Sequence, residues 1–277
     1  MSDDRPRRSL LYVPASDEAM LRKAGTRGAD VLILDLEDGV LPGAKVEARE
    51  TLLRLFAELD LGGAEALVRV NAVGTPWFDD DLRAAQRLRP AGMLLPKCED
   101  PARACVLAER MRLPLWLMVE TALGLLRAPE LARVPGARAL VFGAADFRES
   151  LHAGRHPDEL ELLFARSQLV TAARAAGVLA IDTPWFEYRD SDGLRRSAER
   201  ARLLGFDGKC AVHPGQVGPI HAVFAPTPAE VERARRVLAA LAEAEARGQG
   251  VATLDGEMVE ALHGRAARRT LAQAGVS

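Results

Sequence analysis

Two acidic residues, Glu120 and Asp146, stand at the ends of two successive apolar runs, "LWLMVE" and "ALVFGAAD". If these runs are neighbouring parallel strands, their ends lie at one edge of a sheet and the carboxylates converge. Two such carboxylates repel each other unless a cation or a proton lies between them. An oxygen-only pair with room for water suits Mg²⁺, whereas zinc prefers His or Cys ligands. We therefore predict a Mg²⁺ site; the alternative is two unrelated acids at strand ends.

An arginine, Arg69, lies inside the run "ALVRVN", on the face opposite its two flanking valines. In the run "VLILDLED", Asp35 and Glu37 share one face, and Asp38 follows. Adjacent strands lie about 4.8 Å apart, so Arg69 reaches Asp35 or Glu37. An arginine held by carboxylates keeps its fork oriented and offers free donors to an anionic substrate. We expect substrate binding here; a structural ion pair is the alternative.

Three more runs end in polar residues: Lys97 of "GMLLPK", Asp182 of "LAIDTPW" and His213 of "KCAVHP". If all these runs are parallel strands, their carboxyl ends together form the mouth of a barrel that is charged almost all round. We expect His213 to be mainly structural. The pair His152 and His156 in "HAGRH" has the spacing of a helical zinc site. The glycine inside this segment and the proline after it argue against a helix, so we do not expect zinc there.

Strands and helices that could position these residues alternate along the chain. Apolar runs rich in Val, Ile and Leu, typical of buried parallel strands, are followed by amphipathic segments, eight times over. Three of these segments end at a glycine suited to a left-handed cap: Gly28, Gly177 and Gly205. The order predicts an α/β fold, a (β/α)8 TIM barrel. An open doubly wound sheet is the rival, but neither GxGxxG after the first strand nor GxxxxGK[ST] is present.

The barrel is expected over residues 1–225, as the catalytic domain. Residues 226–277 begin with the long amphipathic segment "TPAEVERARRVLAALAEAEARG", which exceeds what a barrel needs. We expect a C-terminal helical extension that contacts a neighbouring subunit, with a solvated helix as the alternative.

The composition and charge of the chain restrict the classes of molecule that it is expected to bind. The chain has 277 residues, 48% hydrophobic and 27% charged, with a net charge of −2. Dispersed charge of this kind favours a small-molecule partner over nucleic acid or a membrane surface. Three cysteines without a CxxC pattern suit a reducing compartment, and no signal peptide is evident, so we expect a cytoplasmic protein.

Taken together, the motifs resemble the citrate lyase β-subunit-like branch of the HpcH/HpaI aldolase superfamily. The resemblance spans nearly the whole chain and rests on "RSLLYVPAS", "GADVLILDLEDGV", "LVRVNAVGTPWFDDDL", "GMLLPK", "VETALGLL", "LVFGAADF", "AIDTPW", "GFDGKCAVHPGQV" and "LDGEMVE".

The resemblance implies a TIM barrel with C-terminal helices, assembled as trimers or hexamers. It implies that Glu120 and Asp146 bind Mg²⁺ and the substrate, and that Arg69 binds the keto acid. The implied reaction is cleavage of a 3-hydroxyacyl thioester, such as citryl-, malyl- or citramalyl-CoA. The products are an α-keto acid (oxaloacetate, glyoxylate or pyruvate) and an acetyl thioester.

Further site residues follow from the resemblance. Asp255, in an Asp-Gly pair, matches a general acid that an adjacent subunit supplies; a plain turn is the alternative. Arg8, Tyr12 and Lys23 are candidate contacts for coenzyme A, with surface residues as the alternative. Glu37 either only holds Arg69 in place or also moves a proton.

One departure from the family pattern is Ala145, where many relatives carry Glu, so a supporting carboxylate is missing and metal affinity or substrate preference is in question. Two other functions agree less well with the sequence. A class II metal-dependent pyruvate aldolase is disfavoured by Glu37-Asp38, where that branch has Glu-His, and by the long extension. A non-catalytic barrel that binds acyl-CoA or joins citrate lyase subunits in a complex is disfavoured by the intact set of site residues.

Overall fold

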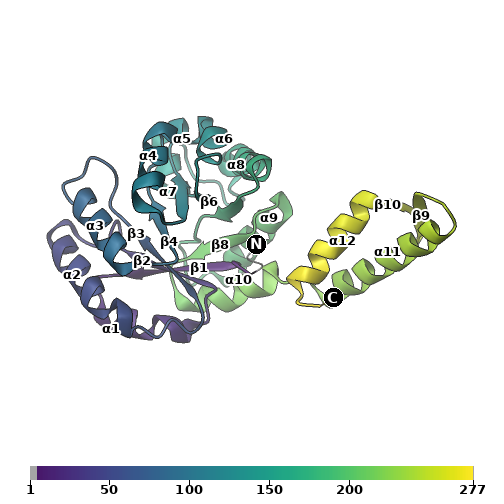
Figure 1. The fold of residues 1–277 in the computed structure, drawn as a ribbon, viewed down its shortest axis with the longest axis horizontal. Coiled ribbons are helices and arrows are strands. Elements are labelled where there is room, and N and C mark those ends of the chain that lie inside the picture. The colour runs from purple at the N-terminus through teal and green to yellow at the C-terminus, as the bar shows by residue number, and fades with distance from the viewer. Residues whose placement is uncertain (1–4, 277) are drawn as a thin grey trace. The chain divides into compact units, whose positions relative to one another are not determined.

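The computed structural model describes residues 5–276. Eight parallel strands form a closed barrel in the order β1 to β8, with β8 pairing back to β1 (Figure 1). The predicted (β/α)8 barrel is thus confirmed. The strands are β1 (Ser9–Pro14), β2 (Val31–Asp35), β3 (Glu65–Arg69), β4 (Gly92–Leu95), β5 (Leu115–Val119), β6 (Ala137–Phe142), β7 (Leu179–Asp182) and β8 (Gly208–Ala211).

Helices connect the strands and cover the outside of the barrel (Figure 1). They are α1 (Glu18–Lys23), α2 (Lys45–Leu55), α3 (Phe78–Leu88), α4 (Pro101–Met111), α5 (Ala122–Leu126), α6 (Ala128–Leu131), α7 (Ala144–Leu151), α8 (Leu163–Ala176), α9 (Ser191–Leu204) and α10 (Val217–Phe224). Short 3₁₀ turns are η1 (Ala24–Arg27), η2 (Pro42–Ala44), η3 (Phe56–Glu58), η4 (Leu160–Leu162) and η5 (Pro214–Gln216).

Two long helices end as the glycine positions predict. Gly177 after α8 and Gly205 after α9 have φ angles of 73° and 98°, and Gly28 after η1 has 70°. A residue with a Cβ is strained in this left-handed region, which explains why glycine ends these elements.

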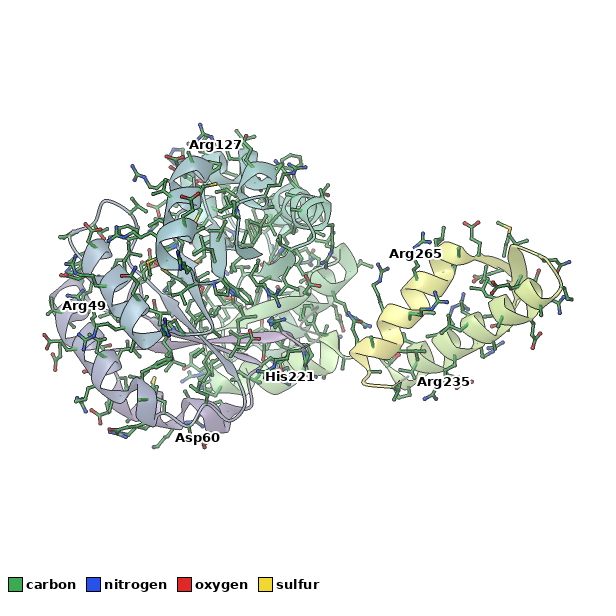
Figure 2. The ribbon with its side chains drawn as sticks, viewed as in Figure 1. Arg49, Asp60, Arg127, His221, Arg235 and Arg265 are labelled. Atoms are coloured by element: carbon green, nitrogen blue, oxygen red, sulfur yellow. The ribbon has the colours of Figure 1, made fainter. Side chains whose placement is uncertain are left out.

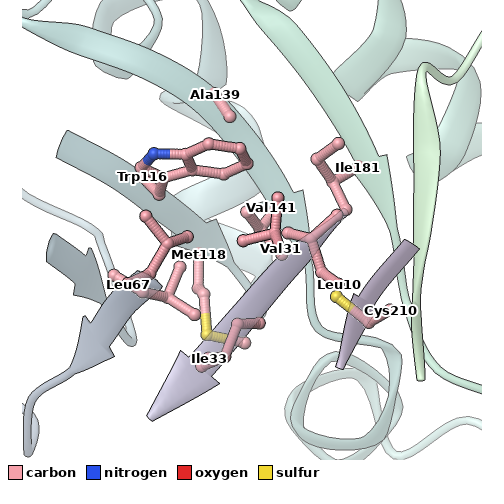
Figure 3. Close-up of a cluster of buried hydrophobic side chains, with 11 residues drawn as sticks. Leu10, Val31, Ile33, Leu67, Trp116, Met118, Ala139, Val141, Ile181 and Cys210 are labelled. Atoms are coloured by element: carbon pink, nitrogen blue, oxygen red, sulfur yellow. The ribbon is translucent and has the colours of Figure 1, made fainter. Parts of the chain in front are cut away.

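The barrel interior is filled by alternate residues of the strands (Figure 3). Buried inward-facing side chains are Leu10, Val31, Ile33, Leu67, Leu94, Trp116, Met118, Ala139, Val141, Ile181 and Cys210. Side chains on one face of a strand recur every second residue. The residues two positions beyond Ile33, Leu67 and Met118 therefore face inward at the carboxyl ends of their strands, where barrel enzymes carry their active sites.

The described chain divides into two compact units, residues 7–221 and residues 222–276 together with residues 5–6. The predicted domain boundary after residue 225 stays a prediction. The second unit contains α11 (Pro228–Ala246), β9 (Val251–Leu254), β10 (Glu257–Glu260) and α12 (Ala261–Gln273). Its own core includes Ala234, Val237, Val259, Ala267 and Leu271. Exposed arginines such as Arg235 and Arg265 lie on its two helices (Figure 2).

The helical extension also contains an antiparallel hairpin, β9–β10, that we did not predict. Its turn is Asp255-Gly256, with φ angles of 52° and 82°. Two successive positive φ angles match the tight hairpin turn that Asp-Gly favours. Among the residues described, no helix is both long enough and apolar enough to span a bilayer.

Candidate active site

A pocket of about 340 Å³ opens at the carboxyl ends of the barrel strands. It is lined by Tyr12, Pro14, Asp35, Asp38, Gly39, Arg69, Met118, Glu120, Gly143, Ala144, Ala145, Asp146, Thr183, Pro184, Phe186 and Val212. The lining thus includes the predicted substrate-binding arginine and both predicted metal ligands.

Arg69 is buried and held by Asp35 on the neighbouring strand. Its Nε and Nη2 each lie 2.7 Å from one oxygen of the Asp35 carboxylate. The same carboxylate accepts hydrogen bonds from the backbone amides of Glu37 and Gly39 at 2.8 and 2.9 Å. The Tyr12 ring lies against the guanidinium, 4.7 Å from ring centre to Cζ. The Asp35 carboxylate, itself held by two backbone amides, and the Tyr12 ring therefore define one orientation for the Arg69 fork.

Glu37 approaches the remaining nitrogen of that guanidinium. Its Oε2 lies 3.0 Å from Arg69 Nη1, at an angle that does not make a hydrogen bond, and its Oε1 lies 3.6 Å from Lys97 Nζ. Burial raises the pKa of the Glu37 carboxyl to about 7, against the opposing attraction of Arg69. Asp38, with an exposed side chain, is 3.6 Å from Arg69 Nη1. Of the two candidate partners, Asp35 makes the bidentate pair and Glu37 carries a carboxyl that titrates near neutrality.

Glu120 and Asp146 lie on the same pocket. Glu120 is buried directly after β5, and its Oε1 accepts a hydrogen bond from the Lys97 backbone at 2.7 Å. Asp146 is on the first turn of α7, rather than at the end of β6 itself. Burial, followed by the nearby charge of Glu37, raises the pKa of Glu120 to about 8. A buried carboxylate in such surroundings is stabilised in its charged form by a cation.

Gly143 leaves room beside Glu120. A Cβ at this position would lie 2.4 Å from Glu120 Oε2, closer than packed atoms approach. No cluster of three or more potential His, Cys, Asp or Glu ligands occurs in residues 5–276. Two carboxylates with the remaining positions left for water and substrate oxygens fit Mg²⁺, which keeps several waters and needs near-octahedral geometry. The donor set therefore fits the predicted metal.

Lys97 joins the two acidic groups, although the sequence assigned it no role. Its backbone has φ 50°, and its Nζ lies 3.6 Å from Glu37 and 3.9 Å from Asp146. The left-handed backbone lets the amide face Glu120 while the ammonium faces the other two carboxylates. Its place at the end of "GMLLPK" was the signal available in the sequence.

Comparison with known proteins places this geometry in a family. The model of the HpcH/HpaI aldolase/citrate lyase family matches residues 8–214. The chain belongs to this family. The match spans all eight barrel strands and every residue that lines the pocket.

Named members of the family resemble the chain over most of their length. A (3S)-malyl-CoA thioesterase of Cereibacter sphaeroides is 42% identical over 97% of this chain and 95% of its own. The mitochondrial citramalyl-CoA lyase of Rattus norvegicus is 35% identical over 92% of this chain and 82% of its own. CitE from Mycobacterium tuberculosis, solved with magnesium, acetoacetate and coenzyme A, is 32% identical and aligns with a TM-score of 0.86. That alignment covers 98% of this chain and 99% of CitE. These comparisons confirm the family resemblance and the predicted enzyme class, a CoA-ester lyase.

One residue expected at the charged mouth lies elsewhere. Asp182 is fully buried and faces outward, because its neighbour Ile181 faces into the barrel. Its carboxylate lies 2.8 Å from Arg166 Nε and 2.6 Å from Lys209 Nζ. The expectation that Asp182 charges the mouth was therefore wrong. His213 packs against the Tyr188 ring, with centroids 5.0 Å apart, and caps η5; its mainly structural role stays a prediction.

The candidate coenzyme A contacts are not brought together. Tyr12 lies at the pocket beneath Arg69. Arg8 precedes β1, at the amino end of the barrel opposite the pocket, where it forms a bidentate pair with Asp30 at 2.9 Å. Lys23 is exposed at the last residue of α1. Contact of these residues with coenzyme A stays a prediction.

Asp255 belongs to the second unit, at the tip of the β9–β10 hairpin. It pairs with Arg236 and lies 3.9 Å from Arg233 Nη1. The residues that line the pocket all belong to the barrel unit. A role for Asp255 in a neighbouring subunit stays a prediction.

Proposed function

We propose that this protein is a Mg²⁺-dependent lyase that cleaves a 3-hydroxyacyl-CoA to an α-keto acid and an acetyl thioester. The observation that carries the proposal is that the oriented Arg69 fork and the carboxylates of Glu120 and Asp146 line one pocket. A guanidinium fork beside a pair of metal-binding carboxylates suits a substrate that carries a carboxylate next to a hydroxyl. The magnesium and coenzyme A in the CitE structure support the same assignment.

The residues of the chain divide the work of this reaction. Glu120 and Asp146 would hold Mg²⁺, which supplies Lewis-acid stabilisation of negative charge on the substrate oxygens. Arg69 donates hydrogen bonds to the oxygen that becomes the keto group, and preorganised donors of this kind contribute about 3 kcal/mol each to transition-state stabilisation. Glu37 lies beside Arg69, and its ionised carboxylate is the proposed acceptor of the hydroxyl proton, becoming a neutral carboxylic acid.

Breaking the carbon–carbon bond then leaves its electron pair on the acetyl thioester as an enolate, which needs one proton. Asp255 of a neighbouring subunit is the proposed donor. This role requires an oligomer, and we propose the trimer or hexamer that the family resemblance implies. The cytoplasm is the proposed compartment.

The charge of the pocket restricts which keto acid it can bind. Among the described residues that line it, Arg69 is the only cation. Four lining residues are acidic, namely Asp35, Asp38, Glu120 and Asp146, and Pro184, Phe186 and Val212 are apolar. Burying a second carboxylate without a cationic partner is costly. We therefore favour glyoxylate or pyruvate as the keto acid over oxaloacetate, and malyl- or citramalyl-CoA over citryl-CoA.

Hydrolysis of the thioester is the second candidate. It is favoured by the 42% identity to a (3S)-malyl-CoA thioesterase. It is also favoured by Glu37, a carboxyl with its pKa raised by burial to about 7, which suits a general base acting on water near neutral pH.

Product analysis separates the two reactions. The full chain is incubated with Mg²⁺ and malyl-, citramalyl- or citryl-CoA, and keto acid, acetyl-CoA and free CoA are quantified. A lyase releases keto acid and acetyl-CoA in equal amounts, whereas a thioesterase releases free CoA and the hydroxy acid. Glu120→Ala is the matched control. Absence of turnover of all three substrates, with wild type indistinguishable from Glu120→Ala, would contradict the proposed function.

A further inference from the structure

Thr183 is a buried hydroxyl on the pocket with no role assigned so far. It directly follows β7, lines the pocket and is 1% exposed. Its Oγ1 accepts a hydrogen bond from the backbone amide of Ala144, the first residue of α7, at 3.1 Å. The hydroxyl therefore lies beside the start of the helix that carries Asp146.

Within the described residues this hydroxyl accepts one hydrogen bond and donates none. A threonine hydroxyl accepts hydrogen bonds and also donates one. The Ala144 amide uses the acceptor side, and no group among residues 5–276 accepts the Thr183 proton. A buried donor without an acceptor is unfavourable, so the site is suited to an acceptor that arrives with a ligand or with water.

The surroundings indicate an anionic acceptor. The amino end of α7 carries partial positive charge from its unpaired backbone amides, and Gly143 before α7 makes no side-chain cap. Residues 143–146 and Thr183 line the same pocket as Arg69. A carboxylate oxygen bound in this pocket would be attracted by the partial positive charge at the start of α7 and could accept a hydrogen bond from the Thr183 hydroxyl.

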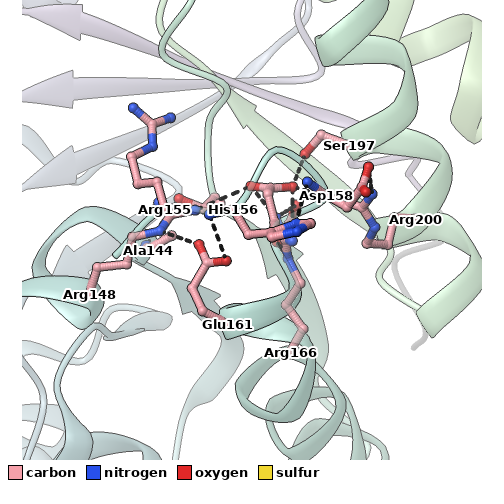
Figure 4. Close-up of polar contacts among 12 residues, drawn as sticks. Ala144, Arg148, Arg155, His156, Asp158, Glu161, Arg166, Ser197 and Arg200 are labelled. Atoms are coloured by element: carbon pink, nitrogen blue, oxygen red, sulfur yellow. Dashed lines mark hydrogen bonds and ion pairs between the residues drawn. The ribbon is translucent and has the colours of Figure 1, made fainter. Parts of the chain in front are cut away.

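The backbone beneath Thr183 is held from the other side of the strand. The preceding residue, Asp182, is fixed outside the barrel by Arg166 and Lys209. Arg166 in turn contacts Glu159, which also accepts hydrogen bonds from the buried Ser197 and the partly exposed Arg200 (Figure 4). Such a network leaves the Thr183 backbone little freedom to move away from the pocket.

We propose that the Thr183 hydroxyl donates a hydrogen bond to the carboxylate of the keto acid and is a substrate-binding residue. This inference rests on the proposed function, since it requires that a keto acid binds the pocket. It assigns Thr183, rather than Arg69 alone, to the recognition of the acid.

The test compares Thr183→Val, which removes the hydroxyl at nearly constant shape, with Thr183→Ser, which keeps it. Isothermal titration calorimetry of the full chain measures Mg²⁺ affinity first, and then the affinity for pyruvate and glyoxylate at saturating Mg²⁺. Hydrogen bonds to charged groups are strong, so Thr183→Val should weaken keto-acid binding about tenfold or more, with Thr183→Ser within about threefold of wild type. Mg²⁺ affinity should be unchanged in both. If Thr183→Val does not fold, Thr183→Ala removes the same donor without adding bulk.

The possible outcomes distinguish failure of the proposed function from failure of the role of Thr183. Wild type that binds neither acid in the presence of Mg²⁺ overturns the proposed function together with this inference. Wild type and Thr183→Val that bind the acids equally well overturn the role of Thr183 alone. A loss of Mg²⁺ affinity in Thr183→Val that matches its loss of keto-acid affinity also overturns that role, since the hydroxyl would then serve only to place α7.

Discussion

Arg69 and Asp35 are direct partners across the β2–β3 register, and their side chains form two parallel hydrogen bonds of 2.7 Å. Bidentate pairing fixes the plane of the guanidinium as well as its position. The third nitrogen, Nη1, is turned toward the carboxyl groups of Glu37 and Asp38. The orientation of this pocket arginine is therefore set by the protein itself, without a ligand.

Arg69→Lys should lower kcat/KM for the acyl-CoA substrate about 100-fold or more. Lysine keeps the positive charge but not the planar fork, so it cannot pair with Asp35 and present a donor to the substrate in fixed geometry. Steady-state kinetics checks this result. Arg83→Lys, on the exposed face of α3, is the matched control and should behave as wild type. Equal kinetics for both variants would exclude the fork as a requirement.

Gly143→Ala should reduce Mg²⁺ affinity, because the added Cβ would meet Glu120 Oε2 at 2.4 Å and push the carboxylate aside. Calorimetric titration with Mg²⁺ measures the loss, which we expect to be about tenfold or more, in the range found when a metal site loses its supporting geometry. Gly43→Ala is the control, since nothing lies within 4 Å of a Cβ at that position. An unchanged Mg²⁺ affinity for Gly143→Ala would mean that Glu120 is not a ligand.

Activity should rise with pH through about 7 as Glu37 loses its proton, because burial raises the pKa of this carboxyl to about 7. Below this pH Glu37 is neutral and cannot accept a proton, so kcat should fall about tenfold per pH unit. The profile is measured at saturating Mg²⁺, which keeps Glu120 ionised. Glu37→Gln should be slow and should lack the inflection; a variant that keeps the wild-type profile argues that Glu37 only holds Arg69.

Arg166→Met should destabilise the barrel by about 3–5 kcal/mol, since it leaves Asp182 and Glu159 buried with one partner fewer. Burial alone would raise the pKa of both acids, but the opposing charges of Arg166 and Lys209 lower it below the ordinary value. Their contribution to stability is thus present above pH of about 4 and is lost as pH falls through the lowered pKa values.

Chemical denaturation between pH 3 and 7 tests this expectation, and the stability of Arg166→Met should depend less on pH at the acidic end. Arg155→Met, at an exposed ion pair with Glu187, is the control and should cost less than about 1 kcal/mol. Similar losses for the two variants would contradict a stabilising role of the buried network.

Mixing Asp255→Asn chains with Glu120→Ala chains should restore part of the activity if Asp255 completes a neighbour's site. Asparagine is chosen because Asp255 has φ 52°, a conformation that Asn tolerates better than Ala. Each variant alone should be inactive in the lyase assay. If the mixed sample stays inactive although both chains assemble together, Asp255 does not act in trans.

Local pattern was enough to predict the barrel and to place Asp35, Arg69 and Glu120 at the carboxyl ends of its strands, where they line the pocket. Side chains alternate along a strand, so apolar positions such as Ile33, Leu67 and Met118 also indicate that Asp35, Arg69 and Glu120 face inward. The family motifs supported the Mg²⁺ prediction and added the thioester. The β9–β10 hairpin departs from the predicted helical extension, because Asp255-Gly256 forms a tight turn between two strands.

The tertiary structure decided which groups are partners, because partner choice depends on strand register and backbone direction. The β2–β3 register assigns Arg69 to Asp35 and leaves Glu37 with a raised pKa. The inward position of Ile181 turns Asp182 away from the mouth, to Arg166 and Lys209. The sequence by itself determined that Arg69, Glu120 and Asp146 belong to the carboxyl end of the barrel, because strand alternation and strand ends are local features. Only the tertiary structure decided which of these residues contact each other. The register between strands, and the backbone conformation of Lys97 after β4, both depend on packing against neighbouring elements.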